Sequence, residues 1–365
     1  MKLPIDVKAV IEAATDIESA SNTPVSVSVL IDDSAPGDVA AHVRTAFVGA
    51  GAHARVTVGY FEGPAFSPYE NDDMAVIVAG LSDEVGKRAA DIRAAGVPVM
   101  VVTSMPKLVA DMASAYGSPI PEGDLVAPEA SAECAPEESA EAEGGASAAA
   151  AAGSAGSSDD PDAPIPIDDA AAAALDRRMG EWVVAACREK RLALALSFPF
   201  VRRPLSLEAV NATSIQNAGI GLVAFIPGAD LPLMTLNQAK MLLQVAAAYG
   251  EPMSAARVKE LAAIVAGGFA CRSFAREVAG VVPGVGWAVK AGVGYAGTKA
   301  MGLAAVEYFE RGGNIAGLAG VVSSATAKAT KVAGDVAATP AGARVVSTAK
   351  SVIRKSAASV LKKTE

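Results

Sequence analysis

The sequence has few of the residues from which disulfide scaffolds, zinc sites and aromatic cores are built. Among its 365 residues are three cysteines and two histidines, and only 5% of the chain is aromatic. Cys134, Cys187 and Cys271 lie far apart in unrelated contexts, which excludes a disulfide framework and a zinc finger. We therefore expect no structural metal ion and no bound cofactor.

The chain also lacks a secretory signal and a clean membrane span. Residues 1–20 alternate apolar and charged side chains without a continuous apolar core, so we expect the N-terminal domain in the cytoplasm. A spanning helix needs about 20 mostly apolar residues. The best range, 278–306, contains Lys290 and Lys299 on opposite faces of a helix. Burying one of them near the bilayer centre would cost about 2.5–3.5 kcal/mol, so a single clean span is not predicted.

Short β-branched runs alternate with amphipathic stretches in the first third of the chain. The expected strands are residues 25–31, 55–61, 74–80 and 97–103, and the expected helices are residues 6–18, 38–48, 82–95 and 107–115. Ser82 is a natural N-cap, and Gly96 is a natural C-terminal stop. The alternation of strand and helix predicts a small, doubly wound parallel sheet, an α/β domain over residues 1–122.

Ligands of such sheets bind where the strands meet the N-termini of helices. The residues expected at that edge are Asp32, Asp33, Ser34, Gly37, Glu62, Gly63, Ser82, Thr103 and Ser104. A phosphate loop needs glycines, a lysine and a hydroxyl, whereas residues 31–38 have the acidic sequence IDDSAPGD. Because two aspartates at the mouth of the loop repel phosphate, nucleotide hydrolysis is not expected, and we predict that the protein is not an enzyme.

A receiver-like phosphoacceptor is an alternative use of the same edge. Its candidate ligand-binding residues are Asp32, Asp33, Ser34 and Thr103, because paired carboxylates after the first strand could hold Mg²⁺. Against this alternative, the second expected strand is followed by Glu62 and not by a phosphorylatable aspartate. The competing interpretation is that Asp32 and Asp33 cap the next helix and solvate the loop.

An acidic segment separates the two predicted domains. Residues 108–176 contain no Lys or Arg, and eleven acidic residues lie between Glu129 and Asp169. Because the net charge of the whole chain is −9, the rest of the chain carries a net charge of +2. The acids are embedded in Ala, Ser, Gly and Pro, so nothing offsets the entropy of ordering the segment. Residues 123–168 are predicted to be a disordered linker.

Helical signals dominate residues 169–320. The expected helices are residues 171–190, 206–225, 235–249 and 254–266, followed by a long apolar stretch that runs to Phe309. Ser206 is the expected N-cap of the second helix, and Thr235 with Gln238 has the spacing of a capping box at the start of the third. These signals predict an all-α domain, a helical bundle.

Residues 226–312 resemble the YcjF-type domain of unknown function. The resemblance rests on Asp230-Leu231-Pro232, Gln238, Tyr249-Gly250, Gly267-Gly268, the run from Val282 to Gly286 (VPGVG) and Tyr308-Phe309. It implies membrane association and a preceding GTPase-like domain. By the same resemblance IDDSAPGD stands at the phosphate loop, residues 60–63 at the Asp-x-x-Gly turn and residues 102–105 at the guanine-reading Asn-Lys-x-Asp. None of these three motifs is intact, so the domain is interpreted as degenerate.

The glycines of the helical domain favour close helix contacts. In a helix interior each glycine costs about 1 kcal/mol relative to Ala, but it lets backbones approach closely, as in membrane helices. The expected membrane-contact residues are Val282, Pro283, Gly284, Trp287, Gly294, Arg354 and Lys355. A compact helical bundle in water, with Ala and Gly at its contacts, is the competing interpretation.

Residues 321–365 form a basic amphipathic tail. Its lysines and arginines flank an apolar helical face, a pattern typical of helices that lie on anionic lipid. An ordinary solvated helix competes with that interpretation, and nucleic-acid binding is disfavoured because no aromatic residues are interleaved.

The pattern as a whole predicts a non-catalytic adaptor or scaffold at the cytoplasmic face of the cell membrane. We expect self-association through glycine contacts and a protein partner for the N-terminal domain. The alternative is a cytoplasmic nucleotide-binding or phosphoacceptor regulator.

Overall fold

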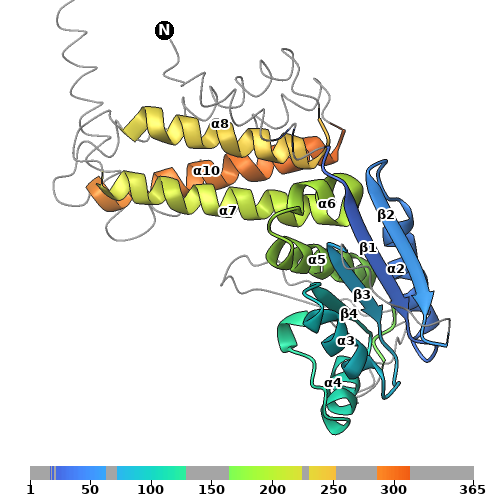
Figure 1. Cartoon of the computed structure of the whole chain (residues 1–365). Coiled ribbons are helices and arrows are strands. Elements are labelled where there is room, and N and C mark those ends of the chain that lie inside the picture. Colours follow the sequence, from blue (N-terminus) through green and yellow to red (C-terminus); the bar gives the residue numbers. More distant parts are fainter. Residues whose placement is uncertain are drawn as a thin grey trace, which may run out of the picture. The chain divides into compact units, whose positions relative to one another are not determined.

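The computed structural model describes residues 17, 19, 22–62, 72–128, 164–223, 230–251 and 286–312 (Figure 1). The chain divides into two compact units, residues 23–201 and residues 1–22 with 202–365. We call them the sheet unit and the helical unit and describe each by itself. The expected helix 254–266, residues 129–163 of the expected linker and the basic tail lie outside the described residues, as does nearly all of the expected helix 6–18.

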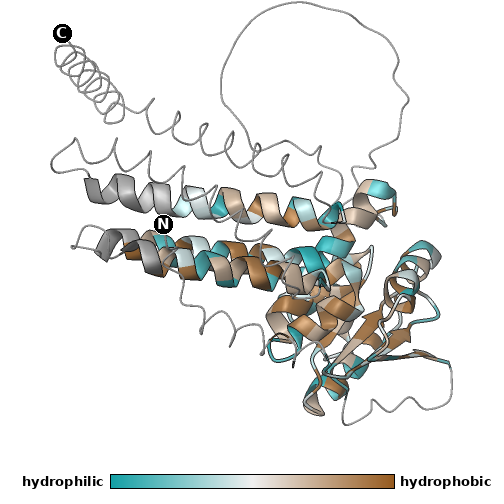
Figure 2. Cartoon of the chain, turned by 90° about the horizontal axis from the view of Figure 1, so that it is seen from above, coloured by the Kyte–Doolittle hydropathy of each residue, from teal (hydrophilic) through white to brown (hydrophobic). Residues whose placement is uncertain are grey.

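The sheet unit is built on five parallel strands. They are β1 (Val25–Ile31), β2 (Ala54–Tyr60), β3 (Met74–Val78), β4 (Val99–Val102) and β5 (Leu125–Val126), in the order β2-β1-β3-β4-β5. In the central register Val29 pairs with Val58 of β2 and with Val76 of β3. β3 and β4 are fully buried runs of hydrophobic residues (Figure 2), as expected for parallel strands that are covered on both faces. The predicted parallel α/β sheet is confirmed.

Helices cover both faces of this sheet. α2 (Gly37–Val48) connects β1 to β2, α3 (Val85–Ala94) connects β3 to β4, and α4 (Pro106–Ala115) leads towards β5. Because the β1–β2 and β3–β4 crossovers step in opposite directions along the sheet, right-handed connections place α2 and α3 on opposite faces. The core beneath α3 and α4 combines Leu30, Ala75, Ile77, Val99 and Val101 of the strands with Val85, Ala89, Ile92, Val109 and Ala113 of the helices.

The helix α5 (Asp169–Ala186) belongs to the sheet unit, although the sequence pattern grouped it with the helical domain. Its Arg178 donates from Nη1 to the Ala127 carbonyl just after β5, at 3.0 Å. Its Asp176 lies 2.8 Å from Nε2 of His42 on α2. Residues 129–163 therefore connect β5 to α5 within one unit, and the boundary between the units falls between Val201 and Arg202.

A buried polar cluster fixes β1 against the start of β3. The Asp72 carboxylate accepts hydrogen bonds from the Ser26 and Ser28 hydroxyls, each at 2.5 Å. Asp73 forms an ion pair with Nζ of Lys190, just beyond α5, at 2.7 Å.

Burial, reinforced by the charge of Asp73, raises the pKa of the neighbouring Cys187 thiol to about 12. A thiol with so high a pKa stays protonated at neutral pH and is no nucleophile.

The described part of the helical unit contains the helices α7, α8 and α10. α7 (Pro199–Val223) begins in the sheet unit and continues in the helical unit, which also holds α8 (Asp230–Ala248) and α10 (Gly286–Glu310). Three expected N-caps are wrong. α3 begins at Val85 with Glu84, not Ser82, at its N-cap, and Ser206 and Thr235 lie inside α7 and α8. The Ser206 hydroxyl donates to the Arg202 carbonyl at 2.8 Å, one turn earlier, which satisfies it within the helix.

A layer of buried polar side chains joins these three helices. Asn217 of α7 and Gln238 of α8 each donate from their amide to Oγ1 of Thr298 on α10, both at 2.9 Å. Asn237 donates from Nδ2 to Oδ1 of Asn217 at 3.1 Å. Asn217, Gln238 and Thr298 have no exposed surface. Another pairing of the helices would leave buried amides without partners, so this layer fixes their register.

One of the α10 glycines allows close packing against α7. A Cβ atom added at Gly302 would lie 2.4 Å from Cγ2 of Val210, whereas one added at Gly297 would meet nothing within 4 Å. Close helix approach is therefore supported at Gly302 and not at Gly297. Within the described residues, no helix has both the length and the apolar character needed to cross a bilayer.

We expect Gly302→Ala to lower the free energy of unfolding of the helical unit by about 1–3 kcal/mol, because the stiff Val210 side chain must give way. The matched control is Gly297→Ala, which should be neutral or stabilising by up to about 1 kcal/mol from helix propensity alone. Urea unfolding of the full chain, followed by far-UV circular dichroism, measures both. Equal effects of the two substitutions would contradict the close approach of α10 to α7.

Candidate functional site at the carboxyl edge of the sheet

The strand order places the candidate site between β1 and β3. In doubly wound sheets ligands bind outside the carboxyl ends of the strands, at the point where the connections diverge to opposite faces. Here β1 leads to α2 on one face and β3 leads to α3 on the other. The crevice is therefore formed by residues 32–36 after β1 and residues 79–84 after β3.

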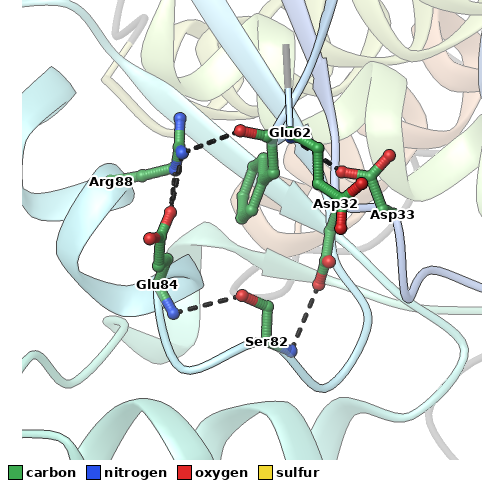
Figure 3. Close-up of polar contacts among 7 residues, drawn as sticks. Asp32, Asp33, Glu62, Ser82, Glu84 and Arg88 are labelled. Atoms are coloured by element: carbon green, nitrogen blue, oxygen red, sulfur yellow. Dashed lines mark hydrogen bonds and ion pairs between the residues drawn. The ribbon is translucent and has the colours of Figure 1, made fainter. Parts of the chain in front are cut away.

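The carboxylate of Asp32 occupies this crevice (Figure 3). Oδ2 accepts a hydrogen bond from the backbone N–H of Gly80 at 2.8 Å. It accepts a second one from the backbone N–H of Ser82 at 3.3 Å, which is drawn in Figure 3. Oδ1 accepts from the backbone N–H of Ser34 at 3.0 Å and from its hydroxyl at 2.9 Å. Asp32 is only 3% exposed. An intramolecular anion thus takes the backbone donors that would otherwise bind a phosphate oxygen.

The two loops approach each other closely where Gly80 meets Ser34. A Cβ atom added at Gly80 would lie 2.3 Å from the carbonyl carbon of Ser34, a distance that real side chains do not adopt. The Ser34 hydroxyl also accepts a hydrogen bond from the Leu81 N–H at 2.9 Å. Glycine at position 80 is required by this contact, and together with Asp32 it closes the crevice.

The rim of the edge is mostly acidic. Asp33 accepts a hydrogen bond from the Glu62 N–H at 2.9 Å through Oδ2, and both residues are exposed. The guanidinium of Arg88 donates to Oε2 of Glu84 at 2.6 Å and to the Phe61 carbonyl at 3.2 Å, and it lies 4.3 Å from the centre of the Phe61 ring. Arg88 is therefore held by local partners and is not directed at the crevice.

Thr103 and Ser104 follow β4, and neither of them is among the described hydrogen-bond partners of Asp32. The buried Thr103 hydroxyl accepts from the Met105 N–H at 3.1 Å, which shapes the turn into α4. The Ser104 hydroxyl is buried, and within the described part of the chain it has no hydrogen-bond partner. Of the other expected edge residues, Gly37 begins α2, with open space where a Cβ would stand, and Gly63 lies outside the described residues.

Residues 164–168, which we call the strap, bind to the same edge and were not predicted to do so. The N–H of Ile165 donates to the Ser104 carbonyl at 3.0 Å. The N–H of Ile167 donates to Oδ2 of Asp38, in the first turn of α2, at 3.3 Å. Asp168 then caps α5 by accepting from the Ala171 N–H at 2.7 Å. The sequence signal that could have found the strap is its Pro-Ile-Pro-Ile alternation, which stands out from the acidic segment before it.

The chemistry available at this edge is limited. Among the described residues, no cluster of three or more His, Cys, Asp or Glu side chains is suited to a metal ion. His42 lies on α2, and its hydrogen bond to Asp176 raises its pKa above the ordinary value, because the carboxylate favours the protonated ring. Both residues join α2 to α5, so the pair holds the unit together.

The expected membrane-contact residues lie mostly beyond the described part of the chain. Trp287 and Gly294 belong to α10. Val282, Pro283, Gly284, Arg354 and Lys355 lie outside the described residues. Comparison of this chain with protein-family models, with curated proteins and with solved structures finds no match.

We expect Asp32→Ala to lower the free energy of unfolding of the sheet unit by about 3 kcal/mol or more, because several backbone donors lose a charged acceptor. The control Asp33→Ala, which removes one exposed hydrogen bond, should change it by less than about 1 kcal/mol. A Trp287→Phe background leaves Trp182, buried in α5, as the fluorescent reporter of urea unfolding. Similar losses of stability in both variants would show that Asp32 does not join the loops.

Proposed function

We propose that this protein is a non-catalytic adaptor that associates with the cytoplasmic face of the cell membrane and offers its sheet unit to a protein partner. The observation that carries the proposal is the Asp32 carboxylate, which takes the N–H groups of Ser34, Gly80 and Ser82. A phosphate group would have to displace this carboxylate and overcome its charge. The sheet unit is therefore suited to surface contacts and poorly suited to nucleotides.

Membrane attachment is supported by the sequence of the second half of the chain. The resemblance of residues 226–312 to the YcjF-type domain implies membrane association. The tail at residues 321–365 adds basic residues on the flanks of an apolar helical face, each contributing about 1 kcal/mol at an anionic lipid surface. We propose attachment through the tail and through contacts of the helical unit, with self-association as a further property.

A phosphoacceptor regulator is the second candidate, and the strand order favours it. The order β2-β1-β3-β4-β5 is also that of receiver-type sheets, and Asp32 and Asp33 follow β1 as they would there. Two features oppose it. β3 is followed by Ala79 and Gly80, with no carboxylate to accept a phosphoryl group, and Asp32 is already engaged by backbone donors.

A thermal-shift measurement separates the two candidates. We expect the melting temperature of the full chain to be unchanged by millimolar GTP, ATP or acetyl phosphate with Mg²⁺. A ligand at about 100 times its Kd would stabilise the native state by about 2.7 kcal/mol, a shift of several degrees. Stabilisation by any of the three, or nucleotide released from the purified protein by acid, would overturn the adaptor proposal.

Flotation with lipid vesicles tests the attachment. The full chain should float with vesicles that contain anionic lipid at low salt, and removal of residues 321–365 should weaken flotation. The matched variant Arg354→Gln with Lys355→Gln should weaken it less, by about fivefold in affinity for each positive charge that is replaced. Flotation of the truncated chain that resists high salt assigns attachment to the helical unit. A full chain that stays unbound at every salt concentration contradicts membrane association.

A further inference from the structure

The strap is bound to the sheet unit in the manner of an extended peptide ligand. Its inward residues, Ile165 and Ile167, are half-buried and donate their N–H groups, whereas Pro164 and Pro166 are exposed. This alternation with a period of two is the pattern by which an extended segment gives side chains to a surface on one side only. The exposed prolines have no N–H group to satisfy, and they restrict the backbone to extended conformations, so little entropy is lost on binding.

The connection that precedes the strap holds it only weakly in place. β5 ends at Val126 and the strap begins at Pro164, so residues 127–163 span a connection far longer than the few residues usual in α/β units. On this side the chain adds little to the tethering of the strap, because the entropy of closure grows with the length of the connection. α5 holds the strap from its other end, so residues 164–167 can leave the edge while α5 remains packed.

The carboxyl edge also has a polar group, the Ser104 hydroxyl, to which the strap makes no described hydrogen bond. Ser104 is 1% exposed, and the strap binds its carbonyl oxygen, but its hydroxyl has no hydrogen-bond partner among the described residues. A buried hydroxyl without a hydrogen bond is unfavourable by about 1–3 kcal/mol. A segment that binds the Ser104 carbonyl and its hydroxyl together would therefore bind better, residue for residue, than the strap does.

We propose that the carboxyl edge between Ser104 and Asp38 is a docking site for an extended peptide segment of a partner protein, with β-branched aliphatic residues at alternate positions. Residues 164–167 of this chain occupy the site as an intramolecular competitor. The proposal rests on the adaptor function proposed above, because it names the class of partner for the sheet unit. Free phosphate and nucleotides are disfavoured ligands here, because Asp32 fills the neighbouring backbone donors.

The test uses the full chain and a fluorescent peptide with the sequence of residues 162–169. In one variant residues 164–167 are replaced by Gly-Ser-Gly-Ser, which removes the competitor and keeps Asp168 as the cap of α5. We expect this variant to bind the peptide at least about tenfold more tightly than the unaltered chain, as measured by fluorescence anisotropy. A control peptide with Asp in place of both isoleucines should not bind. Equal affinities of the two chains, or no binding to a variant that retains its melting temperature, would overturn the proposal.

Hydrogen exchange of the unaltered chain gives an answer even if that variant does not fold. The amides of Ile165 and Ile167 should exchange faster than that of Leu175 in α5, and excess peptide should accelerate them further. Strap amides that exchange as slowly as Leu175, with or without peptide, would show that the strap does not leave. Neither result affects the nucleotide and vesicle measurements, so a failure of the docking site can be told apart from a failure of the adaptor function.

Discussion

The Asp32 carboxylate accepts hydrogen bonds from three backbone N–H groups, and the carboxyl edge of the sheet unit depends on this interaction. It joins the loop after β1 to the loop after β3, and the lack of a Cβ at Gly80 lets the two loops approach each other closely at Ser34. The anion that most doubly wound sheets take from a ligand is here supplied by the chain itself. The Asp32 carboxylate therefore acts as a structural link between the two loops.

Residues 129–163 connect two segments of one unit, since β5 precedes them in the chain and the strap and α5 follow. They carry nine acids. The sheet unit is therefore assembled from two stretches of chain, and its second stretch closes the carboxyl edge. In the docking site proposed above, this arrangement would make the strap a covalently attached competitor of the partner segment.

The helical unit obtains its specificity from small and polar residues rather than from large apolar ones. Gly302 lets α10 approach Val210 of α7, and Thr298 accepts hydrogen bonds from the amides of Asn217 and Gln238. Both features serve helix pairing in water and in lipid, because each depends on satisfied polar groups and close backbones.

The sequence by itself determined the class of the sheet unit and most of its elements. The β-branched runs of β1 to β4, the amphipathic periods of α2 to α4 and the stop at Gly96 are local signals, because each depends on residues a few positions apart. Only the tertiary structure decided the role of Asp32 and the places of β5 and α5. Asp32 accepts hydrogen bonds from N–H groups 48 and 50 positions further along the chain. β5 has only two residues, too few to show a hydrophobic period. α5 completes the sheet unit although residues 127–168 separate it from β5. Ser206 and Thr235 look like caps to a local pattern, yet they lie inside helices because the burial of neighbouring residues in the core extends each helix past its capping signal.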